Sequence, residues 1–187
     1  MKSFFENLLG IIIKPKATIY EIAQTRPVWQ AFFVIAILSL TSALIGHKTG
    51  FDGELDFIFF ISNLLGIFIS SLLIWLSLAG FFALSAWVFR DEKHFRKMLA
   101  LMGFALFPWI FSAPLIFAKV NVPLLVISTI LEIAIWLWSI WLVFYSVHHV
   151  YELSIKKTIL FFITPILGMV IITNWIAQIY TILVSLF

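Results

Sequence analysis

The sequence predicts an all-α integral membrane protein: a helical bundle with about five transmembrane helices, preceded by short interfacial N-terminal helices. Of the 187 residues, 63% are hydrophobic and only 11% are charged, and the mean hydropathy is +1.13. Soluble domains are close to half apolar and about a quarter charged. A soluble fold of this length has too much surface for its volume to bury so many apolar side chains, whereas in a bilayer the outer side chains can face lipid.

Residues 1–26 are expected to form a cytoplasmic or interfacial amphipathic segment. Ser3–Glu6 and Thr18–Glu21 have the spacing of a capping box, which marks the start of a helix, and Pro15 suits a first helical turn. Both predicted helices are too short to cross the ~30 Å hydrocarbon layer, which takes about 20 residues. They are expected to lie in the membrane interface or, as the alternative, to pack on the end of the bundle.

Residues 27–187 are expected to form one transmembrane domain. Five stretches are almost free of charge and long enough to span the bilayer at ~1.5 Å per residue. They cover approximately residues 27–46, 57–89, 98–118, 122–147 and 158–182. The second stretch is long enough to be either one tilted helix or two short spans.

Two prolines are expected to bend predicted spans. Pro108 lies inside the third span and has no N–H to donate, so we expect a kink that frees the carbonyl of Phe104. Pro165 should have the same effect near the start of the fifth span.

The positions of Lys and Arg decide how residues 57–89 are arranged and predict the orientation. Cytoplasmic loops are enriched in Lys and Arg. With one helix over 57–89, only Lys48 and Lys119 of the 12 basic residues lie outside; with two spans, this asymmetry is lost. The single helix is therefore predicted, with the N-terminus in the cytoplasm and the C-terminus on the opposite side.

Glu132 is the one ionisable residue inside a predicted span. It lies about 14 Å along the helix, near the bilayer midplane, where a charge costs at least ~2.5 kcal/mol. Helical spacing places Ser128, Ser139 and Ser146 on the same face, and Trp136, one turn further on, has an indole N–H to offer. We interpret this face as the bundle interior. Its role is either a proton, ion or substrate site, or a hydrogen-bonded contact between helices.

Further polar and small residues lie in the predicted spans. Asn63 is on the second span, and Asn174 and Gln178 begin a helical stripe on the fifth that continues through Thr181 and Ser185. Such side chains usually join helices by hydrogen bonds; the alternative is a polar cavity that opens outward. Small residues on the second span permit close helix contact, within the bundle or in an oligomer: Gly66, Ser70, Ser71, Ser77 and Gly80.

The sequence carries no recognisable enzymatic chemistry. There is no cysteine, which excludes disulfides and thiolate chemistry, and there is no Ser/His/Asp set, glycine-rich phosphate loop or HExxH motif. His148 and Glu152 have a spacing that can share a metal, but such pairs are common at helix ends, so no metal or cofactor is predicted. The net charge of +3 is too small to indicate nucleic acid binding, and the basic clusters suit anionic lipid headgroups.

Four segments resemble the YIP-type family of multi-pass membrane proteins, and particularly its short prokaryotic members. They are Lys14–Ile22 (KPKATIYEI), Phe95–Lys97 leading into Gly103–Pro108 (GFALFP), Ile135–Trp141 (IWLWSIW) and Leu153–Lys157 (LSIKK). The resemblance implies five spans with a cytoplasmic N-terminus and supplies no catalytic residue. The family is named for interaction with Ypt/Rab GTPases; its eukaryotic members carry a longer N-terminal region with an Asp-Leu-Tyr-Gly-Pro-like motif, which residues 1–26 lack.

These observations predict a non-enzymatic polytopic membrane protein with a scaffold or partner-binding role in membrane organisation. Its expected partners are the lipid bilayer and either another membrane protein or a second copy of the chain. The alternative is a small transporter, channel or lipid-translocating protein that uses Glu132 near the midplane.

Overall fold

The computed structural model describes residues 3–50, 57–90, 94–119, 122–163 and 167, and every regular element in that part of the chain is helical, as predicted. The elements are α1 (Phe4–Ile13), α2 (Pro15–Thr25), α3 (Val28–Gly50), α4 (Phe57–Arg90), α5 (Phe95–Ala105), the 3₁₀ helix η1 (Phe107–Phe111), α6 (Ser112–Ala118) and α7 (Val122–Val150). A further helical segment covers residues 155–163.

Four helical stretches in the described part of the chain are long and apolar enough to cross a membrane. They are Val28–Ile45, Phe60–Trp87, Phe95–Ile116 and Leu124–Val150. They correspond to the first four predicted spans, so the chain is an integral, multi-pass membrane protein. The fifth predicted span, 158–182, lies mostly outside the described residues. α4 is one continuous helix, as the loop charges predicted.

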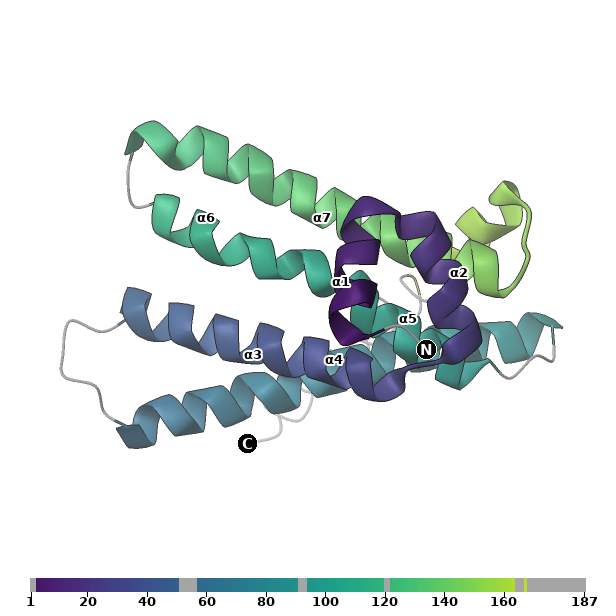
Figure 1. The fold of residues 1–187 in the computed structure, drawn as a ribbon, viewed down its shortest axis with the longest axis horizontal. Helices are drawn as coiled ribbons and strands as arrows, with labels where there is room; N and C mark the ends of the chain where they lie inside the picture. Colours follow the sequence, from purple (N-terminus) through teal and green to yellow (C-terminus); the bar gives the residue numbers. More distant parts are fainter. Residues whose placement is uncertain (1–2, 51–56, 91–93, 120–121, 164–166, 168–187) are drawn as a thin grey trace, which may run out of the picture.

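The membrane helices form two antiparallel pairs with α5 beside both (Figure 1). α3 packs on α4, α6 packs on α7, and α5 contacts α3, α4 and α7. The end of α3 and the start of α4 lie at the same end of the molecule as the end of α6 and the start of α7. α1, α2 and the start of α5 lie at the opposite end (Figure 1). Successive spans therefore run in opposite directions, which fits a single helix over 57–89. Which end of the molecule faces the cytoplasm stays a prediction.

α5 forms the centre of the packed core. Every residue from Met98 to Ala105 is buried. Gly103 is a point of close approach to α3, because a Cβ added there would lie 2.5 Å from the Cβ of Ala31. On the α4 side, Trp75 donates its indole N–H to the carbonyl of Leu99 at 2.8 Å. Since lipid supplies little hydrophobic force between helices, such close packing and hydrogen bonding hold a membrane bundle together.

Pro108 interrupts the third span, and the effect is larger than the predicted kink. α5 ends at Ala105, a 3₁₀ turn follows in η1, and the chain resumes as α6. Pro108 cannot donate to the Phe104 carbonyl; the N–H of Leu106 points to the carbonyls of Met102 and Phe104 instead. The third span is therefore two α-helical pieces joined by a tighter turn.

α1 and α2 pack on one end of the bundle, which was the alternative to a purely interfacial position. α2 contacts α5 and α7 and buries Ile19 and Ile22. The capping box predicted at Ser3 is present, and Pro15 is at the start of α2 as predicted. The capping box predicted at Thr18 is wrong, because Thr18 lies inside α2 and donates its hydroxyl to the Lys14 carbonyl.

The first helices also carry features of an interfacial segment. α1 exposes large apolar side chains, including Phe5, Leu9 and Ile13. Its buried side is tied to α3 by a hydrogen bond of 2.6 Å from the Asn7 amide to the Gln30 side chain. One side of α1 is thus packed on protein, and the other side presents apolar groups outward.

Candidate functional site

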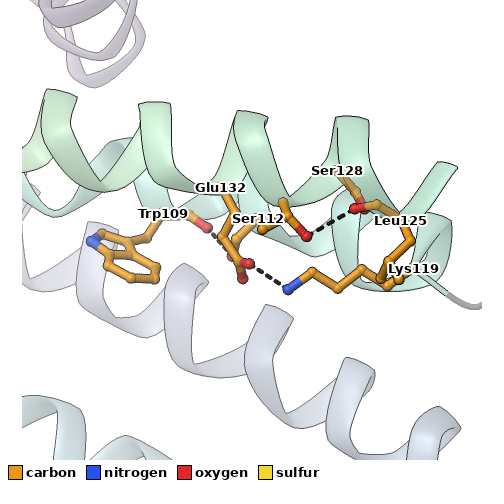
Figure 2. Close-up of polar contacts among 7 residues, drawn as sticks. Trp109, Ser112, Lys119, Leu125, Ser128 and Glu132 are labelled. Carbon is orange, nitrogen blue, oxygen red and sulfur yellow. Dashed lines mark hydrogen bonds and ion pairs between the residues drawn. The ribbon is translucent and has the colours of Figure 1, made fainter.

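The Glu132 carboxylate forms an ion pair and a hydrogen bond with the Lys119 ammonium (Figure 2). Glu132 lies ten residues after the start of α7 at Val122, which is about 15 Å along the helix. Lys119 directly follows α6, and its side chain extends along α7 to reach the carboxylate. The two side chains are 33% and 31% exposed. Pairing neutralises both charges in a region where an isolated charge is costly.

The serine face predicted around Glu132 is buried. Ser128, Ser139 and Ser146 each lie in the interior. Ser128 donates to the Leu125 carbonyl (Figure 2), and Ser146 donates to the carbonyl one turn before it. The Ser139 hydroxyl is buried without a hydrogen-bond partner in the described part of the chain. The face is interior, and two of its three hydroxyls bond to their own helix.

The other predicted site residues do not join this group in the described structure. Trp136, expected as a donor to Glu132, is 52% exposed, and Lys119 is the donor instead. Asn63 lies half-buried on α4, in the other helix pair. Asn174 and Gln178 lie outside the described residues.

Lys119 is the site residue that sequence reasoning missed. Its position between two spans identified it only as a boundary charge. Lysines near span ends usually extend toward the interface, so the spacing carried no signal for an inward direction. Only the packing of α6 against α7 brings the ammonium to the carboxylate.

A hollow with a volume of ≈ 400 Å³ lies within the membrane-spanning part, between α3, α4 and the η1–α6 segment. Its polar lining consists of Thr41, Ser42, Ser71, Trp109 and Ser112. The Ser112 hydroxyl donates to the Trp109 carbonyl at 2.6 Å (Figure 2), and the Thr41 hydroxyl donates to a carbonyl one turn before it. The volume is in the ~300–1,000 Å³ range of small-molecule sites. Its residues come from separate elements, so no single sequence motif marks it.

The histidines at the end of α7 do not form a metal cluster within the described residues, where no group of three or more His, Cys, Asp or Glu side chains could hold a metal ion. The His148 Nδ1 lies 3.2 Å from the Thr158 hydroxyl, and His149 stacks at an angle on the Tyr20 ring.

The family comparison adds to this geometry. The Yip1 domain matches residues 9–177. The chain belongs to the Yip1 domain family. The match confirms the resemblance found in the sequence, and it spans α2 to α7 together with Glu132 and the intramembrane hollow. Comparisons of this Yip1-family protein with curated proteins and with solved structures give no match.

Proposed function

We propose that this Yip1-family protein is a non-enzymatic membrane scaffold that binds another membrane protein, or a second copy of itself, through α4. The observation that carries this proposal is a face of small residues on α4 that the described structure leaves uncovered. Gly66, Ser70 and Ser77 are exposed and recur at helical spacing. Beyond the backbone of α4 itself, no described atom lies within 4 Å of a Cβ placed on Gly66.

Small residues at such spacing suit helix association in lipid. They let two backbones approach closely, so that many van der Waals contacts form at once. Within the bundle Gly103 is used in this way, against Ala31. On α4 the same kind of surface points away from the described helices, so it can receive a further helix, and crosslinking separates a partner or second copy from the predicted span 158–182 of the same chain.

The pairing of Glu132 also supports a structural role. Polar side chains inside membrane spans commonly join helices by interactions between them. Here the Glu132 charge is taken up by Lys119 of the same chain, which joins α7 to the end of α6. The pair thus has the character of a helix–helix contact.

Photo-crosslinking tests the α4 surface. With p-benzoylphenylalanine in place of Ser70, irradiation in native membranes is expected to give an adduct with a protein, either a dimer of this chain or a heteromer identified by mass spectrometry. The matched control places the same residue at Leu137, which is exposed on α7, and is expected to give no such adduct. Equal adducts at both positions, or none at Ser70, would contradict the proposal.

The hydroxyl-lined hollow favours a second candidate function, a transporter or channel. Its Ser112 and Trp109 lie in the segment that contacts α7, so an aqueous path through it is the feature that transport would require. The ion pair favours the scaffold, and water access to position 132 separates the two.

Because the chain has no native cysteine, Glu132→Cys gives a single labelling site. In liposomes, we expect no reaction with a membrane-impermeant thiol reagent from either side, since the proposed role of Glu132 is a contact between helices. Ser154→Cys, exposed beyond the end of α7, is the positive control and should label from one side. Labelling of Glu132→Cys in a folded protein would favour transport.

A further inference from the structure

A hollow of ≈ 370 Å³ lies at the end of the bundle where α1 and α2 pack, apart from the Glu132 region. It is formed where three elements meet. Arg26 directly follows α2, Lys97 lies in the first turn of α5, and His149 lies at the end of α7. Glu152 follows α7 two residues after its end. No single segment of the sequence contains this group.

The hollow carries an excess of positive charge. The Arg26 guanidinium and the Lys97 ammonium both line it. The His149 ring lines it too, and Glu152 is the single carboxylate among the lining residues. In the described part of the chain, neither the guanidinium of Arg26 nor the ammonium of Lys97 makes a hydrogen bond or ion pair. Guanidinium and ammonium groups with unused donors are the groups that bind phosphate oxygens.

The backbone holds two of these side chains in an unusual conformation. Arg26 has φ 50° and Glu152 has φ 47°, and no other non-glycine residue of the described chain has a positive φ. Both follow the last turn of a helix, where glycine normally occupies the left-handed conformation. Both line the same hollow. Such backbone strain is found most often at functional sites. At both positions glycine would fit the backbone better, yet the chain has a guanidinium at one and a carboxylate at the other.

A second hollow of ≈ 780 Å³ adjoins the first and shares Arg26. Its lining is mainly apolar and includes Trp29, Phe95 and Leu99, with Arg96 as a second guanidinium. Trp29 is 76% exposed. Because these residues stand at the starts of two membrane spans, Val28–Ile45 and Phe95–Ile116, the two hollows lie at the level of a membrane interface. Tryptophan is typical of that level.

We propose that these two hollows bind one anionic phospholipid: Arg26 and Lys97 take the headgroup phosphate, and the glycerol and first acyl carbons lie against Trp29 and Phe95. A basic pocket beside an apolar groove at the interface matches the two chemically different ends of such a molecule. Glu152 opposes the anion and weakens its binding. The site does not depend on whether the protein is a scaffold.

Arg26→Gly tests the site without a loss of folding. Glycine is favoured in the left-handed conformation of this position, so the variant should melt at or above the wild-type temperature. It removes the guanidinium, and charge-assisted hydrogen bonds are strong enough that affinity should fall about tenfold or more. Affinity is measured on the purified full chain in detergent, by titration with dihexanoyl phosphatidylglycerol and the resulting rise in melting temperature.

Two variants with single charge changes serve as controls. Lys156→Ala removes an exposed positive charge in the segment that follows α7 and should bind phosphatidylglycerol like wild type. Glu152→Gln removes the opposing carboxylate and should bind more tightly. An equal loss in Lys156→Ala, wild-type affinity in Arg26→Gly, or weaker binding in Glu152→Gln would each overturn the proposal.

Two further ligands identify the source of the phosphate. Dihexanoyl phosphatidylcholine has the same acyl chains without net charge and should bind more weakly than phosphatidylglycerol. Inorganic phosphate should stabilise only at far higher concentration, because it cannot use the apolar groove. If inorganic phosphate acts through Arg26 as strongly as the lipid does, the ligand is a soluble phosphate and the lipid assignment is wrong.

Discussion

Lys119→Met is expected to destabilise the bundle by about 2.5–3.5 kcal/mol, the cost of leaving an unpaired charge in the apolar part of a span. The substitution keeps the length of the side chain but leaves the Glu132 carboxylate without its cation. The carboxylate sits about three turns inside α7 and is too short to reach the interface. The free energy of unfolding is measured by titration with a denaturing detergent.

Glu132→Gln should cost less than Lys119→Met, about 1 kcal/mol, because the loss is close to that of one hydrogen bond. Lys119 lies at the end of α6, and a long side chain there can turn toward the interface once its partner is removed. The difference between the two losses in the free energy of unfolding therefore shows which member of the pair depends more on the other.

The double variant Lys119→Met/Glu132→Leu, measured beside the single variants Lys119→Met and Glu132→Leu, gives a double-mutant cycle. Replacing both members of an ion pair in apolar surroundings by apolar groups is often neutral or stabilising, so the double variant should recover most of the loss of Lys119→Met. If the two single effects simply add, the side chains do not interact, and the ion pair is not a contact that stabilises the bundle.

Gly103→Ala is the second large effect, with an expected loss of about 1–3 kcal/mol from overpacking. The added Cβ would meet the Cβ of Ala31 at 2.5 Å and its backbone oxygen at 3.2 Å. Backbone atoms cannot move aside as the tip of a flexible side chain can, so α3 and α5 must separate. In a lipid environment this also removes the contacts around Gly103 that hold the two helices together.

Gly80→Ala is the matched control for this prediction. Gly80 is also inside a helix, α4, and beyond the backbone of that helix no described atom lies within 4 Å of its added Cβ. Alanine is the better helix former by about 1 kcal/mol, so this variant should be unchanged or slightly more stable. Thermal unfolding of both variants in the same detergent gives the comparison, and a gain in Gly103→Ala would show that the helices do not touch there.

The spans could be predicted from the sequence because they depend on local composition. Charge-free stretches located the first four within a few residues of α3, α4, α5–α6 and α7, and loop charges favoured a single helix over 57–89. The break at Pro108 was expected because a missing N–H acts on the chain directly beside it. The extent of the break at Pro108 could not be predicted, because whether a proline bends a helix or ends it depends on the surrounding packing.

The site was predicted only in part, because the sequence shows relations within one helix but not contacts between separate helices. Helical periodicity placed Ser128, Ser139 and Ser146 on one interior face, since that relation is internal to one helix. The ion pair to Lys119 and the hollow around Arg26 and Lys97 join separate elements. One sequence without the packing of its helices does not carry that information.

Because the middle of α5 is completely buried, oxidation of its two methionine thioethers reports opening of the bundle. Met98 and Met102 are both fully enclosed, so an oxidant reaches them only when surrounding helices part. Conversion to the sulfoxide would place a polar, bulkier group in the centre of the bundle. A molecule oxidised while the bundle is open could not regain its original packing. Sulfoxide at Met98 or Met102 would therefore mark molecules whose helices have separated.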